Sequence, residues 1–377
     1  MQKMKPLLLF LLFPSLLFAQ QLPVPQAPSI AAKSYLLTDF YSKQVLVGQN
    51  INERIEPASL TKLMTAYLTF TALKQKQITL EQMLPISTRA WRAEGSRMFI
   101  KPDKPVKVDE LIHGMVVQSG NDACIALAEG IAGSEEVFAQ MMNREAQRLG
   151  MKNTHFTNST GLPHPQHYST AYDLSLLAAA IIREFPEYYP LYSVKEYKYN
   201  NISQTNRNRL LWTDPYVDGM KTGYTENAGY CLISTAKRGS RRLLSVALGA
   251  ASDSARAIES QKLLNYGFQF YDTLRLYAKG QAVTSFALWK GTENSVKAGF
   301  AEDVYLSIPK GQSERLKATM ESRQPLIAPI SAGQNVGMVK LTLDGKPVAE
   351  YPVIALENVE LANLLGREWD SLRLLFN

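Results

Sequence analysis

The chain has 377 residues, of which 46% are hydrophobic and 20% are charged, and its formal net charge at pH 7 is +7. That length allows two domains, and the apolar content is that of a globular protein and not of a disordered chain. So small a positive charge does not indicate a nucleic-acid partner, although it is compatible with an anionic cell-wall or membrane surface.

Residues 1–19 are interpreted as a secretory signal peptide. Lys3 and Lys5 precede an apolar run from Leu7 to Phe18, which ends at the small residue Ala19. This pattern is typical of a cleaved signal, and the run is too short to span a membrane comfortably. Cleavage after Ala19 would lower the formal charge from +7 to +5, because Lys3 and Lys5 are lost. We therefore expect an exported protein.

The first candidate catalytic motif is Ser59-Leu60-Thr61-Lys62, which opens a helical pattern just after Pro57. Residues three apart lie one turn apart on a helix, so the Lys62 amine can reach the Ser59 hydroxyl. A helix start also offers unpaired backbone N–H groups that can hold a developing oxyanion. Taken alone, the motif is more often an N-cap serine and a solvated lysine.

Two further motifs follow along the chain, Ser119-Gly120-Asn121 and Lys221-Thr222-Gly223. Glycines stand on both sides of the third motif, and a glycine in a strand often marks a close approach of another backbone. An edge strand there can pair with an extended peptide, while Lys221 and Thr222 bind a terminal carboxylate. A basic edge-strand lysine beside a turn glycine is the alternative for this segment alone.

A second S-x-x-K sequence runs from Ser234 to Lys237, as chance allows in a chain of this length. It lies in a segment from Tyr230 to Ala236 that predicts a strand, where residues three apart point to opposite faces. Its serine and lysine therefore cannot meet, and we exclude it as a catalytic pair.

The three motifs in this order predict a serine acyl-transfer enzyme. A serine hydroxyl needs a neighbouring base, and none of the four histidines lies in a recognisable triad motif. Lys62 is therefore the expected base, which requires a pKa lowered by burial or by a nearby cation such as Lys221. Ser119 can relay a proton to the leaving amine, and the Asn121 amide can hold the substrate amide.

On these motifs the chain resembles the D-alanyl-D-alanine carboxypeptidases, low-molecular-mass penicillin-binding proteins of peptidase family S11 that trim bacterial peptidoglycan. The resemblance includes the segments Glu56 to Thr65 and Gln118 to Cys124 and the tripeptide Asn206-Arg207-Asn208. It extends from about Ser34 to near the C-terminus. It implies as partners a peptidoglycan pentapeptide ending in D-Ala-D-Ala and β-lactam antibiotics, and it implies no cofactor and no metal.

The resemblance also implies roles for individual residues. The first serine of such enzymes forms the acyl-enzyme, its lysine is the base and the second serine transfers protons, which gives Ser59, Lys62 and Ser119 as catalytic residues here. An arginine beyond the next strand assists in binding the terminal carboxylate, and Arg256 matches it. Tyr224 stands where close relatives often carry His, and its backbone N–H can complete the oxyanion hole. The expected substrate-binding residues are Asn121, Lys221, Thr222, Gly223, Tyr224 and Arg256.

The expected fold is α/β (α+β), with a catalytic domain like that of serine β-lactamases and transpeptidases in which helices pack against an antiparallel sheet. A flexible mature N-terminus is expected over residues 20–33, and the catalytic domain over 34–275. Residues 276–356 show short alternating strands and a two-residue hairpin turn at Asp344-Gly345, which indicate a small all-β domain. In the catalytic domain, strands are predicted at Ser34 to Leu37, Gly229 to Ala236 and Arg242 to Ala250, and a helix at Thr170 to Arg183.

Residues 357–377 predict an amphipathic helix that anchors the protein to a membrane. The segment is too short and too charged to cross a bilayer, so we expect it to lie on the periplasmic face of the cytoplasmic (inner) membrane as a peripheral anchor. Docking of the helix on the β domain is the alternative. Its apolar face consists of Leu361, Leu364, Leu365, Trp369, Leu372, Leu375 and Phe376, opposite Asn363, Gly366, Arg367, Asp370 and Arg373.

Cys124 and Cys231 both flank the predicted site, and the exported compartment permits a disulfide. Two small buried hydrophobic residues are the favoured interpretation. His164 and His167 lie in a loop without acidic or thiol partners, so no metal site is expected there.

Three other functions stay open. A D,D-endopeptidase is chemically close, and a β-lactamase would share the acyl-enzyme, although no Glu-x-x-Leu-Asn loop follows the second motif. A catalytically weak wall-binding scaffold is the alternative from a different class.

Overall fold

The computed structural model describes residues 26–374. The expected signal peptide, residues 20–25 of the expected flexible segment, and Leu375 and Phe376 of the expected anchor lie outside the described residues. The N–H of Ala31 donates to Glu259 Oε2 (3.1 Å), so the residues just before the first strand contact the long helix α8 (Asp253–Phe270).

A five-stranded antiparallel sheet forms the frame of the first domain, in the order β2-β1-β9-β8-β7. The first strand of the domain pairs with its last, since Ser34 lies opposite Leu248. The third motif lies on β7, at one edge of the sheet, as the sequence predicted for an edge strand. The strands are β1 (Ser34–Asp39), β2 (Val45–Gln49), β7 (Val217–Thr225), β8 (Gly229–Arg238) and β9 (Arg241–Ala250).

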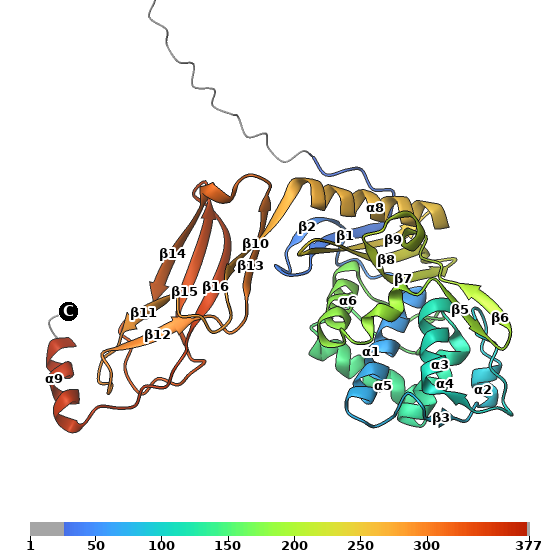
Figure 1. The fold of residues 1–377 in the computed structure, drawn as a ribbon, viewed down its shortest axis with the longest axis horizontal. Coiled ribbons are helices and arrows are strands. Elements are labelled where there is room, and N and C mark those ends of the chain that lie inside the picture. Colours follow the sequence, from blue (N-terminus) through green and yellow to red (C-terminus); the bar gives the residue numbers. More distant parts are fainter. Residues whose placement is uncertain (1–25, 375–377) are drawn as a thin grey trace, which may run out of the picture.

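Helices cover both faces of this sheet. Helix α8 lies along one face, and the helices formed by residues 62–184 pack under the opposite face (Figure 1). Every side chain of α1 from Lys62 to Phe70 is buried, because neighbouring helices and the sheet surround it on all sides. The helices below the sheet are α1 (Lys62–Lys74), α2 (Thr88–Trp91), α3 (Val108–His113), α4 (Asn121–Ala132), α5 (Glu135–Arg148) and α6 (Ala171–Glu184).

Short elements complete the domain and carry parts of the site. A 3-10 turn, η1 (Ala58–Thr61), leads into α1, and a π-helical turn, η2 (Gly114–Gln118), precedes the second motif. The others are β3 (Met83–Leu84), β4 (Val106–Lys107), η3 (Tyr189–Ser193), β5 (Glu196–Tyr199), β6 (Ile202–Thr205) and α7 (Leu210–Thr213).

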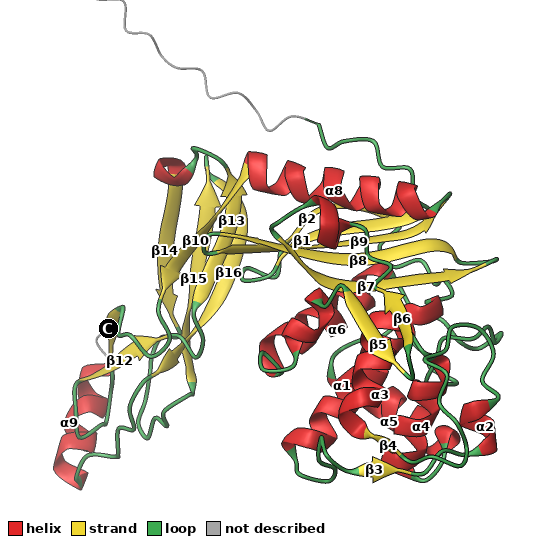
Figure 2. Ribbon diagram, turned by 45° about the vertical axis from the view of Figure 1, so that its right-hand side comes forward, coloured by secondary structure: helices red, strands yellow, loops and turns green. Residues whose placement is uncertain are grey.

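The C-terminal domain is all-β and has its own apolar core. Helix α8 runs directly into its first strand, β10, as Figure 2 shows. β10 pairs with β13, and the remaining strands form a sheet in the order β11-β12-β16-β15-β14. Its strands are β10 (Tyr271–Tyr277), β11 (Thr284–Ala287), β12 (Ser295–Gly299), β13 (Val304–Pro309), β14 (Leu316–Ser322), β15 (Asn335–Leu343) and β16 (Lys346–Ala355), with a turn η4 (Ser313–Arg315).

The predicted hairpin turn joins β15 and β16. Asp344 and Gly345 have φ values of 52° and 78°, and a two-residue turn with two positive φ values matches the twist of the flanking strands.

The two domains meet through the turn between β1 and β2. Ser42 Oγ lies 2.8 Å from Ser307 Oγ, and the Ser307 N–H donates to Gln44 Oε1 at 2.6 Å. Lys43 forms an ion pair with Glu302 at 3.3 Å. Because Ser307 lies on β13, these contacts hold the edge of the C-terminal domain against the catalytic sheet.

The C-terminal helix α9 (Leu364–Leu374) lies at the end of the β domain that is farthest from the catalytic domain (Figure 1). Leu365 and Trp369 are 83% and 65% exposed. The polar side of the helix contacts the β domain instead, since Asp370 Oδ2 accepts the Lys290 N–H at 2.6 Å. No helix in the described part of the chain is long and apolar enough to cross a membrane.

Candidate functional site

Ser59 and Lys62 lie one turn apart where η1 passes into α1. Lys62 Nζ donates to Ser59 Oγ at 2.9 Å and to the carbonyl oxygen of Thr160 at 2.6 Å. The lysine side chain is buried, whereas Ser59 lines an open cleft of about 560 Å³. The geometry therefore puts an amine directly behind a hydroxyl that a substrate can reach.

Burial lowers the pKa of Lys62 from 10.5 to about 8. Among nearby charges, Arg207 lowers this pKa further and Asp122 raises it. The sequence had suggested Lys221 as the cation that acts on Lys62. The pKa of Lys221 is itself held well below its usual value, first by burial and then by the charge of Lys62. Arg207 is therefore a cation acting on Lys62 that the sequence analysis did not name for this role, beside the mutual repulsion of Lys62 and Lys221.

The second motif brings Ser119 and Asn121 to the same cleft. Ser119 follows η2 with a φ of 68°, and its Oγ accepts a hydrogen bond from Lys221 Nζ at 3.0 Å. Asn121 Nδ2 donates to the carbonyl oxygen of Glu94 at 2.6 Å. The Asn121 Oδ1 atom is buried and has no hydrogen-bond partner among the described residues, so it can accept an N–H from a ligand.

The turn that carries Ser59 is enclosed by two glycines. A Cβ atom on Gly223 would lie 3.2 Å from the carbonyl oxygen of Pro57, so β7 packs directly against this turn. A Cβ atom on Gly161 would fall 1.8 Å from the carbonyl oxygen of Ala58. The glycine of the third motif therefore marks the close backbone approach that the sequence predicted.

The third motif supplies one wall of the cleft, and its lysine is buried behind that wall. Thr222, Gly223 and Tyr224 line the cleft, while Lys221 lies behind it, donating to Ser119 and to the carbonyl oxygen of Thr222 at 3.0 Å. Tyr224 is 51% exposed and lies 4.4 Å, centroid to centroid, from the ring of Tyr230. An aromatic surface thus stands where the sequence analysis noted a departure from close relatives.

Arginines gather at one end of the cleft. Arg256 Nη1 donates to the carbonyl oxygen of Gly223 at 3.0 Å, and the same guanidinium pairs with Asp253. Arg209 pairs with Asp253 as well, at 2.7 Å. Arg207 lines the cleft and donates to the neutral Ser96 Oγ at 2.8 Å. Positive charge therefore exceeds negative charge here, which suits an anionic ligand group.

All nine residues proposed from the sequence surround one site. Seven line the cleft, and the two lysines of the first and third motifs lie buried beneath it. Sequence reasoning did not single out Arg207 or Thr160 as site residues. Arg207 was visible only as part of the tripeptide Asn206-Arg207-Asn208, and Thr160 contributes a backbone carbonyl, which every residue type has.

Cys124 and Cys231 are free and buried. Burial raises the pKa of the Cys124 thiol to about 12 and that of Cys231 to about 11, so both remain protonated thiols at neutral pH. His167 is also buried, with Nε2 2.7 Å from Thr61 Oγ1, and burial lowers its pKa to about 4. Within residues 26–374, no group of three or more His, Cys, Asp or Glu is arranged to hold a metal ion.

Comparison with known proteins gives matches over almost the whole chain. The family described as D-alanyl-D-alanine carboxypeptidase matches residues 21–252, and the one described as penicillin-binding protein 5, C-terminal domain, matches residues 271–361. The D-alanyl-D-alanine carboxypeptidase DacC of Escherichia coli is 42% identical over 377 residues, covering 98% of this chain and 94% of the relative. The DacA enzyme of Haemophilus influenzae is 41% identical over 351 residues, with 92% and 89% covered.

Among solved structures, penicillin binding protein 5 from Haemophilus influenzae is similar with a TM-score of 0.87. It shares 40% sequence identity, and the match covers 89% of this chain and 99% of that structure. The similarity therefore includes both the cleft and the C-terminal β domain.

Proposed function

The chain belongs to the D-alanyl-D-alanine carboxypeptidases of peptidase family S11, and we propose that it removes the terminal D-alanine of peptidoglycan pentapeptides through an ester on Ser59. The observation that carries this assignment of the nucleophile is the 2.9 Å contact between the buried amine of Lys62 and the Ser59 hydroxyl at the cleft. Penicillin forms an ester with the same serine, because its strained amide resembles the bond that is cleaved.

In the acylation step, Ser59 Oγ attacks the carbonyl carbon of the penultimate D-alanine. The neutral amine of Lys62 takes the hydroxyl proton as the new C–O bond forms. Backbone N–H groups of Ser59 and Tyr224 stabilise the negative charge that develops on the carbonyl oxygen. Collapse of this intermediate breaks the C–N bond, and terminal D-alanine leaves with a proton delivered through Ser119.

Ser119 suits proton delivery because of its partner. Lys221 Nζ donates to Ser119 Oγ, so one lone pair of that oxygen is occupied and its own proton can be directed to the leaving nitrogen. Water then hydrolyses the ester on Ser59, which releases the shortened peptide and restores the serine.

Substrate binding is assigned to the remaining residues of the cleft. The terminal carboxylate is placed between Thr222 and Arg256, within the positive potential of Arg207 and the buried Lys221. Asn121 Oδ1 accepts an N–H of the substrate backbone, since its amide nitrogen is already held by Glu94. An extended peptide can pair with the free edge of β7.

The direct test is to treat the protein with penicillin and locate the adduct by mass spectrometry. The expected result is a single adduct on Ser59, together with release of D-alanine from a pentapeptide ending in D-Ala-D-Ala. An adduct on Ser119 or Ser234, or no adduct, would contradict the assignment.

We further propose that α9 attaches the exported protein to the periplasmic face of the cytoplasmic membrane. The support is the orientation of the helix, because its polar residue Asp370 contacts the β domain while Leu364, Leu365 and Trp369 face away from it. An apolar helix face of this kind binds a lipid interface by burying its side chains among the headgroups and acyl chains.

A further inference from the structure

The carbonyl oxygen of Thr160 is the shorter of the two contacts of the Lys62 amine, at 2.6 Å. Thr160 belongs to a loop, residues 157–162, that is buried at Ser159 and Thr160. Thr65, one turn along α1 from Lys62, donates through Oγ1 to the Ser159 carbonyl oxygen at 2.6 Å. The loop backbone thus follows α1 beside the base, and its position fixes one partner of that base.

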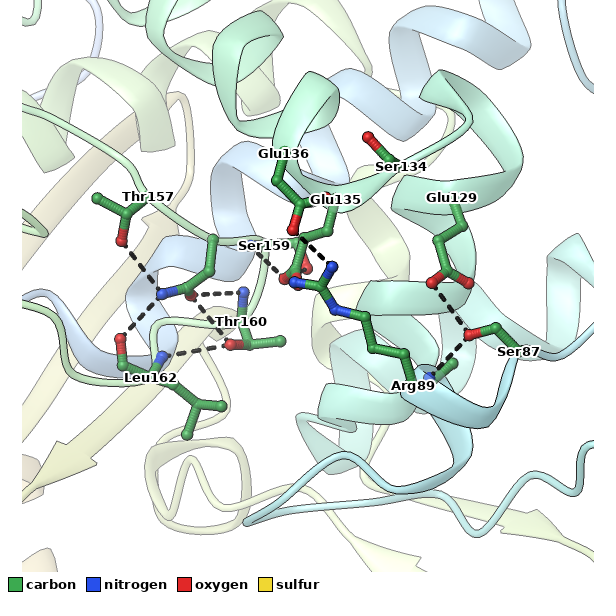
Figure 3. A network of polar contacts seen from close by, with 12 residues as sticks. Ser87, Arg89, Glu129, Ser134, Glu135, Glu136, Thr157, Ser159, Thr160 and Leu162 are labelled. Carbon is green, nitrogen blue, oxygen red and sulfur yellow. Dashed lines mark hydrogen bonds and ion pairs between the residues drawn. The ribbon is translucent and has the colours of Figure 1, made fainter.

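Glu135 ties this loop to α5. Its Oε1 atom accepts hydrogen bonds from the Ser159 N–H at 2.9 Å and from Ser159 Oγ at 2.6 Å. Its Oε2 atom accepts from Arg89 Nη2 at 2.6 Å (Figure 3). The Glu135 side chain is only 5% exposed, so these partners replace the water that a carboxylate would otherwise need.

Other hydrogen bonds of the loop lie within it or at its start. Asn158 Oδ1 accepts the N–H groups of Thr160 and Gly161 at 3.1 and 2.7 Å, which shapes the loop from within. His167 Nδ1 accepts the N–H of Thr157, at the loop's start, at 3.1 Å. Two side chains therefore join Ser159, the residue just before Thr160, to helices outside the loop: Thr65 binds its carbonyl oxygen from α1, and Glu135 binds its N–H and hydroxyl from α5.

We propose that Glu135 is a positioning residue for the acylation step, which it controls by holding the Thr160 carbonyl against Lys62 Nζ. This inference rests on the proposed role of Lys62 as the base. A lysine side chain has a flexible stem, and its neutral amine carries two N–H bonds and one lone pair. When Thr160 accepts one N–H, the amine is oriented, and its lone pair can be turned to the Ser59 hydroxyl. A displacement of about 1 Å at such a contact costs up to about 100-fold in rate.

The neighbouring residue provides a matched control. Glu136 is the next residue of α5 and pairs with the same arginine, through Arg89 Nη1 at 2.6 Å. Its side chain is 65% exposed, and it forms no hydrogen bond or ion pair with the loop among the described residues. Glu135→Ala and Glu136→Ala each remove one carboxylate from the same helix start and from the same arginine. Only the first change removes hydrogen bonds of Ser159, those of its N–H and hydroxyl.

The experiment measures acylation by a chromogenic β-lactam, separating the noncovalent dissociation constant from the acylation rate constant. Glu135→Ala is expected to lower the rate constant by about tenfold or more, with a smaller change in the dissociation constant, because Glu135 does not line the cleft and the wall formed by Thr222, Gly223 and Tyr224 is unaltered. Glu135→Gln should recover most of the rate, since an amide oxygen can accept both bonds from Ser159. Glu136→Ala should behave as the unchanged protein does.

A pH profile distinguishes positioning from a loss of folded protein. The groups that act on Lys62 are Asp122, Cys124 and Arg207, with Lys221 on the neighbouring strand, and none of them is altered. Weakening of the hydrogen bond from Lys62 Nζ to the Thr160 carbonyl oxygen changes the balance between the ammonium and the amine form of Lys62. The midpoint of the acylation rate against pH therefore moves by more than about half a unit. Partial unfolding would instead lower the number of titratable active sites and leave the midpoint unchanged.

The proposal is overturned if Glu135→Ala acylates like Glu136→Ala, or if its rate falls equally at every pH. If Glu135→Ala does not fold, Ser159→Ala removes only the hydroxyl bond to Glu135, and a smaller fall in the same rate constant is expected, with no fall counting against the proposal. If the proposed function itself is wrong, the protein without substitutions will not carry its β-lactam adduct on Ser59.

Discussion

At the scale of single residues, the central quantity is the fraction of Lys62 that is neutral. A pKa lowered to about 8 leaves about one tenth of the amine unprotonated at pH 7, whereas an ordinary lysine would leave less than about a thousandth. Since only the neutral amine can accept the Ser59 proton, we expect acylation to rise from pH 6 to about pH 9 and then level off. The measurement is the rate of acylation by penicillin, followed by stopped flow across this pH range. A rate that is flat or falls between pH 7 and 9 would contradict Lys62 as the base.

Replacement of the base by a permanent cation should stop the reaction. In Lys62→Arg the guanidinium stays charged at every accessible pH, so it cannot accept the hydroxyl proton, and acylation should fall by at least about 1000-fold. Lys237→Arg is the matched control, because Lys237 belongs to the second S-x-x-K sequence, on β8. Thermal unfolding of both variants shows whether the fold survives. Near-normal acylation by Lys62→Arg would exclude Lys62 as the base.

The site residues differ in how visible they are in a sequence. Ser59 and Lys62 could be paired because their spacing is one helical turn and two further motifs follow in order, and Ser234 and Lys237 could be rejected because they lie on a strand. Glu135 gave no such signal. Its connection to Lys62 passes through a backbone carbonyl and through chain segments that only tertiary packing brings together.

At the scale of elements, the position of Ser59 depends on backbone segments that pack directly against each other, with no side chain between them. Gly161 has a φ of 86°, and a Cβ there would meet the Ala58 backbone, which cannot move aside as a flexible side chain would. Gly161→Ala should therefore lower the free energy of unfolding by more than about 3 kcal/mol and reduce acylation sharply. Denaturant unfolding and β-lactam acylation are the measurements.

Gly150→Ala separates the cost of a positive φ from the cost of a Cβ atom placed against the backbone. Gly150 has a φ of 79°, but a Cβ there would have no atom within 4 Å. This variant should lose only about 1–2 kcal/mol of unfolding free energy and acylate normally. Equal effects of the two substitutions would show that the close approach to Ala58 is not what matters.

The elements themselves followed from the sequence where local patterns were strong. The strands begun at Ser34 and Gly229, the helix capped by Thr170 and the hairpin at Asp344 all form as predicted. The π-helical turn before Ser119 and the positive φ of that serine were not predicted. Unlike Asp344 in its Asp-Gly turn, a serine takes this conformation only when its surroundings impose it, so no local pattern indicates it here.

At the scale of the whole molecule, attachment to a membrane should be separable from catalysis. Truncation after Ala362 removes α9 but keeps the bridges of Val359 to Ile330 and of Leu361 to Gly291, so the β domain remains closed. We expect the truncated protein to move from the membrane fraction to the soluble periplasmic fraction while it still binds penicillin. Identical partition of the two forms would contradict the anchor.

A double substitution, Leu365→Asp with Trp369→Asp, tests the same helix without shortening the chain. These side chains face away from the β domain, so the fold should be unaffected while lipid binding is lost. Glu368→Gln, a change in the same helix that adds no charge, is the control and should stay with the membrane.

The pairing of β1 with β9 determines when, during synthesis, the catalytic sheet can form. Ser34 is made early, but its partner across the sheet, Leu248, comes only near the end of the domain. At about 5–20 residues per second, a growing chain waits on the order of 10–40 s between the two strands. During that interval the segment with Ser59 and Lys62 exists without the sheet that buries it, so a chain released before residue 241 should carry the nucleophile and yet bind no penicillin.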